Sequence, residues 1–403
     1  MRLARAGAGV VAAAMVAAPL SSGDAGAAPR CLGRAATITH GENHLIRGTS
    51  GDDVITAYDG EYVVRAGRGN DLVCVDSRED DGHGGPGNDR LHATDSSAQL
   101  FGESGADRID GGDAYGYGGP GDDRVQGGYV QGNKGDDVLV GNGRGTLSFI
   151  YSRTRVRVDL RKGLATGEGR DRISRFKHVY GSVRDDVLIG DARPNHMRGL
   201  GGDDELRGGG GDDPFIFGGA GRDLLVGGPG DDRLEGAWHP DSFVAGGGDD
   251  FVRADYGDDS VVLGAGDDEV AADHGDDDVT GGAGTDLVRY YDWSDPVEID
   301  LDGGWAEGAG SDTLTGFENA EGGWGNDVVR GTSGPNVLSG GAGDDRLEGR
   351  AGDDEIDGQD GVDAADGGDG TDACVNAETP ISCEEVQPVA RAIVYLIGSI
   401  TTA

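Results

Sequence analysis

Aspartate residues recur every nine positions along most of the chain. In the segment 340–357, GGAGDDRLEGRAGDDEID, Asp345 and Asp354 each end a glycine-rich stretch, and a large apolar residue follows each of them two positions later. A carboxylate next to exposed glycine carbonyls is a set of hard oxygen ligands, which is the set that Ca²⁺ prefers. Mg²⁺ fits less well because it demands tighter octahedral geometry. The spacing therefore predicts many similar calcium sites.

The repeat has the frame G-G-x-G-x-D-x-U-x, in which U is a large apolar residue. Two units depart from it: bulky turn residues in GAWHPDSFV (236–244) argue against Asp241 as a ligand, and Asn336 replaces Asp in GTSGPNVLS. The predicted calcium ligands are Asp53, Asp71, Asp89, Asp107, Asp123, Asp137, Asp204, Asp213, Asp223, Asp232, Asp250, Asp259, Asp268, Asp277, Asp286, Asp327, Asp345, Asp354, Asp363 and Asp372.

The elements that position these carboxylates are short. The last three residues of each unit favour a strand whose middle side chain points inward, and the first six favour a turn in which glycine permits positive φ. Two consecutive nine-residue units make one flattened coil. One inward row per coil is too small to form a core, so neighbouring coils must stack about 4.8 Å apart.

Three units, GGAGDDRLE (340–348), GGPGDDRLE (227–235) and GGAGRDLLV (218–226), closely match the hemolysin-type calcium-binding nonapeptide. The chain resembles the RTX family over roughly 48–375. The resemblance implies an all-β fold, a right-handed parallel β-roll (β-solenoid) of stacked 18-residue coils, with each Ca²⁺ between turns one coil apart. It assigns Asp213, Asp232, Asp250, Asp268 and Asp286 to one edge, and Asp204, Asp223, Asp259 and Asp277 to the other.

The first coils differ from the later ones. Asp53, Asp71, Asp89 and Asp107 recur at twice the nine-residue spacing, and the units between them mostly lack turn glycines. Since two units make one coil, we expect calcium on one edge only in this part.

Two segments break the nine-residue frame, 156–190 and 297–331. They resemble each other at a constant offset, which matches Val156 with Val297 and Asp186 with Asp327. Their V-x-V-D-L and V-x-I-D-L patterns predict wider coils that continue the solenoid. The first is basic, and its candidate polyanion patch is Arg153, Arg155, Arg157, Arg161 and Lys162. A solvated face that balances neighbouring aspartates is the alternative interpretation of this basic segment.

Composition excludes several classes of protein. The chain has 80 glycines, 3 methionines and 8 phenylalanines, so an ordinary globular core is not expected. Its 75 acidic residues against 34 Lys and Arg give a formal charge of −41, which argues against nucleic acid as a partner. The regular apolar spacing argues against disorder.

The termini and cysteines indicate export. Arg2 and Arg5, an apolar run and small residues up to Ala27 predict a cleaved secretory signal, and no later segment is long enough to span a membrane. Four cysteines allow three pairings, of which we expect Cys31–Cys74 and Cys374–Cys383, because each would close one end of the chain.

We expect seven regions. They are a signal at 1–27, an N-terminal β-roll at 28–140, a basic spacer at 141–198, the main β-roll at 199–289, a second spacer at 290–321, a C-terminal β-roll at 322–375, and a cap and tail at 376–403.

The predicted function is that of a secreted, extracellular calcium-binding β-roll that folds on binding Ca²⁺ and has a structural or cell-surface role. It is not an enzyme: the pair His40 and His44 lacks the H-E-x-x-H spelling, and the evenly spaced aspartates single out no catalytic pair. The alternative is a carbohydrate or cell-wall binding module that uses the basic patch and the tryptophans Trp238, Trp293, Trp305 and Trp324. Tryptophans gathered on one face would favour it. A remnant or accessory of a secreted RTX enzyme is a further alternative.

Overall fold

The computed structural model describes residues 30–39, 44–58, 60–76, 79–290, 293–308, 310–383 and 385–387. The predicted signal at 1–27 lies outside the described residues. The described part of the chain consists of strands and turns without a helix, and so contains no helical segment that could cross a membrane.

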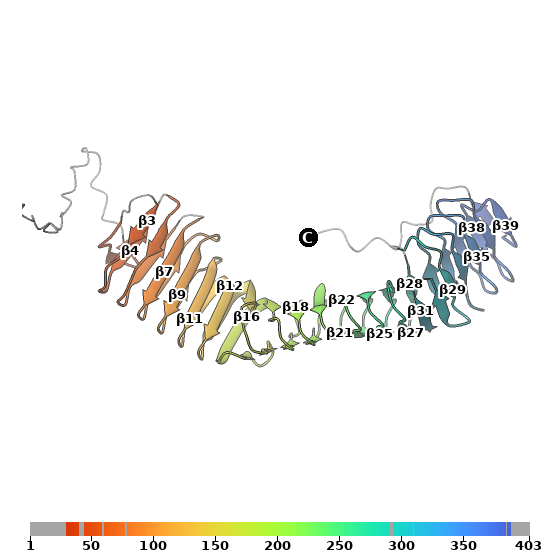
Figure 1. The fold of residues 1–403 in the computed structure, drawn as a ribbon. Helices are drawn as coiled ribbons and strands as arrows, with labels where there is room; N and C mark the ends of the chain where they lie inside the picture. Colours follow the sequence, from red (N-terminus) through yellow and green to blue (C-terminus); the bar gives the residue numbers. More distant parts are fainter. Residues whose placement is uncertain are drawn as a thin grey trace, which may run out of the picture.

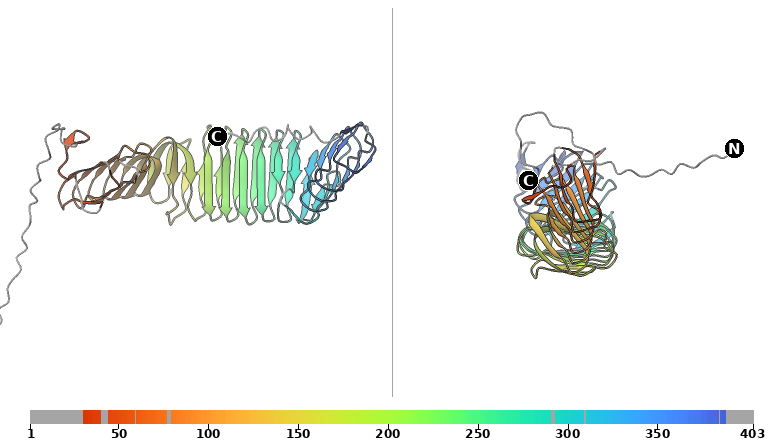
Figure 2. Two further views of the ribbon diagram at one scale, coloured as in Figure 1. Left: turned by 90° about the horizontal axis from the view of Figure 1, so that it is seen from above. Right: turned by 90° about the vertical axis from the view of Figure 1, so that its left-hand side faces the viewer.

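The strands stack into a long parallel β-solenoid with two faces, as predicted (Figure 1). Each coil contributes one strand to each face, and each strand pairs with the equivalent strand of the next coil. In the central segment Leu206 pairs with Leu225, and Leu225 with Phe243. Figure 2 shows these coils side by side.

Face A contains β4 (Val54–Ala57), β6 (Leu72–Val75), β8 (Arg90–Ala93), β10 (Arg108–Asp110), the first parts of β12 (Arg124–Lys134), β13 (Val138–Ser148) and β16 (Arg170–Tyr180), β15 (Leu164–Thr166), β14 (Arg157–Asp159), β17 (Val187–Ile189), β19 (Glu205–Arg207), β21 (Leu224–Pro229), β23 (Ser242–Gly247), β25 (Ser260–Ala265), β27 (Asp278–Ala283), β31 (Ser311–Thr315), β30 (Trp305–Glu307), β29 (Glu298–Asp300), β33 (Val328–Arg330), β35 (Arg346–Glu348), β37 (Ala364–Asp366) and β39 (Thr379–Ile381).

Face B contains β3 (Leu45–Arg47), β5 (Val63–Arg65), β7 (Asp81–Pro86), β9 (Gln99–Ser104), β11 (Tyr115–Pro120), the second parts of β12, β13 and β16, β18 (His196–Gly201), β20 (Phe215–Ala220), β22 (Arg233–Trp238), β24 (Phe251–Tyr256), β26 (Glu269–Ala271), β28 (Leu287–Arg289), β32 (Asn319–Glu321), β34 (Val337–Ser339), β36 (Glu355–Asp357), β38 (Ala373–Val375) and β40 (Glu385–Gln387).

The core is a single column of inward side chains between the two faces. The middle residue of each strand triplet supplies it, and Leu206, Ile216, Leu225 and Leu234 are completely buried. No strand buries more than a small apolar row, so each coil depends on its neighbours for stability.

The two spacers each insert a β-hairpin into face A only. In the first spacer β14 and β15 pair antiparallel, β15 pairs antiparallel with β16, and β14 then pairs parallel with β17. In the second, β29, β30, β31 and β33 repeat this arrangement. Face B meanwhile continues without extra strands, from β16 to β18 and from β28 to β32. The expected wider coils are therefore hairpins confined to one face.

The solenoid bends at both hairpins (Figure 1). Two additional strands lengthen face A by about 10 Å at each position, because neighbouring strands lie about 4.8 Å apart. Face A forms the convex side of the arc, whereas β18, β22 and β28 of face B lie on the concave side. Each inserted hairpin thus lengthens face A relative to face B, and this difference in length bends the solenoid.

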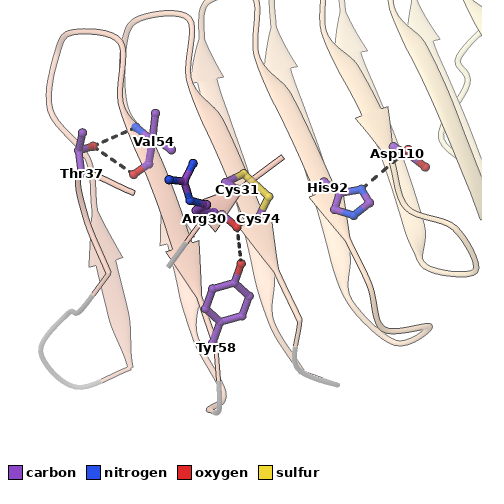
Figure 3. The surroundings of a disulfide bond; sticks show 8 residues. All are labelled: Arg30, Cys31, Thr37, Val54, Tyr58, Cys74, His92 and Asp110. Carbon is purple, nitrogen blue, oxygen red and sulfur yellow. Dashed lines mark hydrogen bonds and ion pairs between the residues drawn. A yellow bond between two sulfur atoms is a disulfide. The ribbon is translucent and has the colours of Figure 1, made fainter. Parts of the chain in front are cut away.

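Both expected disulfide bonds are present, Cys31–Cys74 and Cys374–Cys383. The first ties a short antiparallel hairpin, β1 (Arg30–Cys31) and β2 (Arg34–Ala35), onto the outer surface of face A. There Cys31 packs against Val54 and Leu72. The hydroxyl of Tyr58 donates a 3.0 Å hydrogen bond to the carbonyl oxygen of Arg30 (Figure 3). The hairpin therefore covers the first two strands of face A.

Candidate metal sites

The position-six aspartates form continuous ladders along the two edges of the solenoid. The main-chain N–H of Asp213 donates a 2.8 Å hydrogen bond to Oδ1 of Asp232, and the N–H of Asp232 donates in turn to Asp250 at 2.7 Å. Each carboxylate is thus held by the coil before it. The turn glycines bring successive coils close enough for this bond to repeat.

The ladder of the first edge has three sections. They run through Asp53, Asp71, Asp89, Asp107, Asp123, Asp137 and Asp171, through Asp186, Asp204, Asp223, Asp241, Asp259, Asp277 and Asp312, and through Asp327, Asp345 and Asp363. The ladder of the second edge has two sections, Asn195, Asp213, Asp232, Asp250, Asp268 and Asp286, and Asn336, Asp354 and Asp372.

The second oxygen of most of these carboxylates is buried without a hydrogen-bond partner. This orphaned Oδ2 belongs to Asp71, Asp89, Asp107, Asp123, Asp137, Asp204, Asp213, Asp223, Asp232, Asp241, Asp250, Asp259, Asp268, Asp286, Asp345, Asp354 and Asp363. A buried acceptor without a partner is unfavourable, and a bound cation would remove that penalty.

Carbonyl oxygens of the following coil lie close to the orphaned atoms. A Cβ placed on Gly227 would overlap both Oδ2 of Asp232 and the carbonyl oxygen of Ala245, and one on Gly208 would overlap Oδ2 of Asp213 and the carbonyl oxygen of Gly227. Glycine gives the closest approach at this first position of the turn, although the buried Ala245, Ala254, Leu263 and Ala272 occupy it in later units. The donor set, a carboxylate and main-chain oxygens from two coils, fits a hard divalent cation.

No three His, Cys, Asp or Glu side chains within the described residues converge as a metal-binding group. Any cation in these turns would take much of its coordination from main-chain carbonyls. This is compatible with Ca²⁺, which accepts peptide oxygens as readily as carboxylates.

Burial raises the pKa of the ladder carboxyls. For Asp250 the pKa rises to about 8: desolvation is the largest cause, the hydrogen bond from the N–H of Asp232 opposes it, and the charges of Asp232 and Asp268 add to it. The pKa of Asp241 rises to about 8 and that of Asp232 to about 6, again mainly through desolvation. Without a cation, burial therefore disfavours the ionised form of these carboxyl groups.

Asp241 is as well placed as its neighbours. The prediction excluded it because Trp238, His239 and Pro240 replace small turn residues. In the structure Oδ1 of Asp241 accepts a 2.7 Å hydrogen bond from the N–H of Asp223, and its Oδ2 is orphaned. The turn tolerates the substitutions because Ala237 and His239 adopt positive φ angles of 92° and 79°.

The first residue of a ladder section differs from those that follow it, because its side-chain oxygen also accepts a hydrogen bond within its own turn. In Asp53 and Asp327, both predicted ligands, Oδ2 accepts a 2.6 Å hydrogen bond from the N–H four residues earlier, which belongs to Thr49 or Gly323. The Oδ1 atom of Asn336 accepts one from Thr332 in the same way. These oxygens already have a hydrogen-bond partner in their own turns, so they are not among the buried oxygens that lack one. Thr instead of Gly at position two, in the GTSG stretches at 48–51 and 331–334, could have distinguished two of them.

Sequence reasoning missed the ends of the ladders in the spacers. Oδ1 of Asp171 accepts a hydrogen bond from Asp137, and Oδ1 of Asp312 accepts one from Asp277. Asp171 and Asp312 are equivalent positions of the duplicated segment. At Asp312 the hydroxyl of Tyr290 donates a 2.6 Å hydrogen bond to Oδ2.

Position five carries a second ladder that the sequence reasoning also missed. The N–H of Asp249 donates a 2.9 Å hydrogen bond to Oδ1 of Asp231, and the N–H of Asp267 donates to Asp249 at 2.9 Å. These bonds lead to the preceding coil, whereas the position-six bonds lead to the following one. Where Asp occupies both positions, the Asp-Asp pair therefore ties its turn to both neighbouring coils.

The first coils carry the long ladder on one edge. On the other edge the equivalent residues include the buried Ala98 and Ala114, although Oδ1 of Asp80 accepts a 2.7 Å hydrogen bond from the N–H of Tyr62. The ladder carboxylates thus lie mainly on one edge, and calcium on that edge only stays a prediction.

The predicted docking residues lie on the surface. Arg153, Arg155 and Arg157 are exposed, whereas Arg161 and Lys162 both pair with the buried carboxylate of Asp159. The structure thus splits the candidate polyanion patch into three arginines without an ion pair among the described residues and two cations that are partly neutralised.

The tryptophans are partly gathered. Trp238 stacks on Tyr256 at 4.9 Å, and Tyr256 continues through His274 to Trp293 along one edge. The main-chain N–H of Trp324 donates a hydrogen bond to the carbonyl oxygen of Trp293. Trp305, in contrast, lies on face A. Trp238 is 58% exposed at the end of this row of rings, and Trp324 is 67% exposed, whereas Trp293 meets His274 edge-on.

A parallel β-solenoid whose turns carry ladders of buried, half-satisfied carboxylates is a metal-binding β-roll. The family model of the RTX calcium-binding nonapeptide repeat (4 copies) matches residues 45–73, 83–114, 180–213, 215–238, 235–270, 253–288, 321–355 and 340–373. These matches span more than half of the chain, and the chain belongs to this family. A search of curated proteins found no match.

Proposed function

We propose that this protein is an exported β-roll that folds when calcium fills its turns and then serves as a rigid, non-catalytic structural or surface-interaction rod. The single observation that carries the proposal is the repeated buried Oδ2 without a hydrogen-bond partner. The residues proposed to hold calcium are those that carry this orphaned atom.

The energetic basis is linkage between binding and folding. Without metal, Asp232, Asp250 and Asp268 bring like charges together in successive turns, which disfavours the folded coils. At free calcium ten times the dissociation constant each site adds about 1.4 kcal/mol of stability. Ten such sites would add roughly 14 kcal/mol, comparable with the whole stability of a typical domain.

The decisive experiment is a calcium titration of the mature chain followed by circular dichroism and small-angle scattering. We expect little β signal and an expanded chain in chelator, and a β spectrum with a curved-rod profile in millimolar calcium. Identical spectra and profiles in both conditions would contradict the proposal. A titration with Mg²⁺ is the control for the choice of metal.

A second candidate function is binding of an acidic surface polymer. The exposed Arg153, Arg155 and Arg157 of the first spacer favour it, since they carry positive charge on a rod that is otherwise strongly acidic. Neutral carbohydrate is less favoured, because the tryptophans do not gather on one face: Trp305 lies on face A, and Trp293 is partly buried.

A further inference from the structure

Four arginines form a straight row on the outer surface of face A in the N-terminal coils. The strand register places Arg90 beside Arg108 and Arg108 beside Arg124. Arg124 pairs with Val138, which pairs with Arg172. The arginine row is Arg90, Arg108, Arg124 and Arg172. It spans four strand spacings, or about 19 Å.

The arginine row has no ion-pair partner within the described part of the chain. All four side chains are exposed, and none contacts a carboxylate closely enough to form a salt bridge. Arginines of the later coils behave differently, since Arg207 pairs with Glu205 and Arg233 with Glu235. In a chain with 75 acidic and 34 basic residues, aligned and unpaired arginines are unexpected.

Alignment of like charges on neighbouring strands disfavours folding. Later coils avoid it at the same outward position, where Glu205, Leu224, Ser242, Ser260 and Asp278 occur in register. The row is therefore a local feature, which ends at the disulfide-bonded hairpin on one side and at the first spacer on the other.

The arginine row leads into a cleft of about 880 Å³ at the first spacer. Lys162, Arg170 and Arg172 line the cleft, together with Asp136 and Asp137. We call this cleft at the first spacer the spacer cleft. Asp110, an acidic residue beside the row, has its carboxylate 3.8 Å from Nδ1 of His92 (Figure 3).

The second spacer provides an internal comparison. At the constant offset of the duplication, Lys162, Arg170 and Arg172 correspond to Gly303, Ser311 and Thr313. The hairpin is the same in both modules, so these cations are not needed to build it. The structural role of the hairpin therefore does not account for the three cations of the first spacer.

We propose that the arginine row and the spacer cleft bind one extended chain of a polysaccharide that carries sulfate or carboxylate groups. Guanidinium groups bind both anions through paired hydrogen bonds. Three arginines on successive strands and a fourth two strands further on match an extended polymer with repeated charges better than an isolated ion. No aromatic side chain lies in the row to stack on bases, which disfavours single-stranded nucleic acid.

This inference deepens the second candidate function and is separable from calcium-dependent folding. The probe is fluorescent dextran sulfate, compared with carboxymethyl dextran and neutral dextran of the same length, in buffer with excess calcium. We expect the folded protein to bind one or both charged dextrans but not the neutral one. The tighter of the two identifies the anionic group.

The row variant combines Arg90→Gln, Arg108→Gln, Arg124→Gln and Arg172→Thr. Its affinity should fall by about ten-fold or more, because four exposed charge contacts of modest strength are lost together. A matched control, Arg207→Gln, Arg222→Gln, Arg233→Gln and Arg346→Gln, changes the net charge equally and should keep the affinity. Unchanged calcium-dependent circular dichroism in both variants separates loss of binding from loss of folding.

Replacement of Lys162, Arg170 and Arg172 by Gly, Ser and Thr gives the first cleft the residues of the second spacer, and it should also weaken binding. The proposal is overturned if the row variant keeps its affinity or if the control loses as much. It is also overturned if neither charged dextran binds, or if an oligodeoxythymidylate binds as tightly as the better dextran.

Discussion

The main-chain N–H of Asp232 donates a 2.7 Å hydrogen bond to Oδ1 of Asp250 in the next coil, while Oδ2 of Asp250 is buried without a partner. One oxygen of each carboxylate therefore connects coils, and the other is left for a cation. This division of roles explains why an acidic residue is repeated where an amide could make the same backbone contact.

Replacement of Asp232 by Asn should remove calcium from its turn. Asn keeps an oxygen for the hydrogen bond from Asp213 but removes the negative charge. We expect fewer calcium ions per chain by isothermal titration calorimetry, and a loss of about 1–3 kcal/mol in the presence of calcium. Asp231→Asn is the matched control, since its side chain lies in the exposed position-five ladder; an equal loss there would contradict the assignment.

Replacement of Gly227 by Ala should have a larger effect than Ala at another turn glycine. The new Cβ would overlap Oδ2 of Asp232 and the carbonyl oxygen of Ala245, so these atoms must shift apart, as the turn of the next coil allows around Ala245 itself. We expect a higher calcium midpoint for folding and a loss of roughly 1–3 kcal/mol. At Gly210 the nearest atom to a new Cβ is 3.8 Å away, so Gly210→Ala should stay close to the wild type in the same titration.

Acid should partly replace calcium. The pKa of Asp250 is raised to about 8 and that of Asp232 to about 6 in the folded state, whereas the pKa of Asp in an unfolded chain is about 3.9. A raised folded pKa means that protons favour the fold: this stability is complete below the unfolded pKa and is lost as pH rises through the folded values. Metal-free protein should show more β signal at pH 5 than at pH 9. Equal or greater signal at pH 9 would refute this.

The same linkage predicts that calcium binding releases protons. The calcium midpoint should therefore rise as the pH falls from 8 to 6, within the range of the raised pKa values of Asp232 and Asp250. Titrations at several pH values in two buffers of different protonation enthalpy would measure the number of protons released.

Deletion of residues 154–169 should straighten the rod at the first bend. It removes the inserted hairpin and leaves Asp137 and Asp171 one ordinary coil apart. Small-angle scattering should show a less curved particle. The control, deletion of residues 259–276, removes one central coil and should shorten the rod by about 4.8 Å without changing either bend. A curvature that survives the first deletion would show that the hairpins do not cause it.

Much of the fold could be predicted because one short pattern recurs. The inward positions of Leu206 and Leu225 follow from spacing, the two edges of aspartates from the family resemblance, and both disulfides from the placement of the cysteines near the two ends of the chain. The hairpins did not follow, because V-x-V-D-L indicates a strand but not the direction of its partner. Two faces share every coil, so periodicity cannot assign an inserted strand to one of them.

The candidate site was only partly predictable for a related reason. Asp53 and Asp71 both occupy position six of the repeat, yet Oδ2 of Asp53 is bonded to Thr49, whereas that of Asp71 is orphaned. The difference depends on the path of each turn, since at Asp53 and Asp327 an N–H of the same turn donates to Oδ2. The role of Asp231 at position five was hidden in the same way, since its partner Asp249 lies in the next coil.

Both hairpins enter the same face, so both bends turn the rod toward the same side, which the nine-residue repeats alone would not do. A further copy of the duplicated segment would add another bend toward the same side, so successive copies would wind the rod toward a closed ring. Copies placed in alternate faces would give a zigzag of unlimited reach. The number of hairpins and the choice of face are therefore the variables by which such a chain can change its global shape, while every turn keeps the same nine-residue rule.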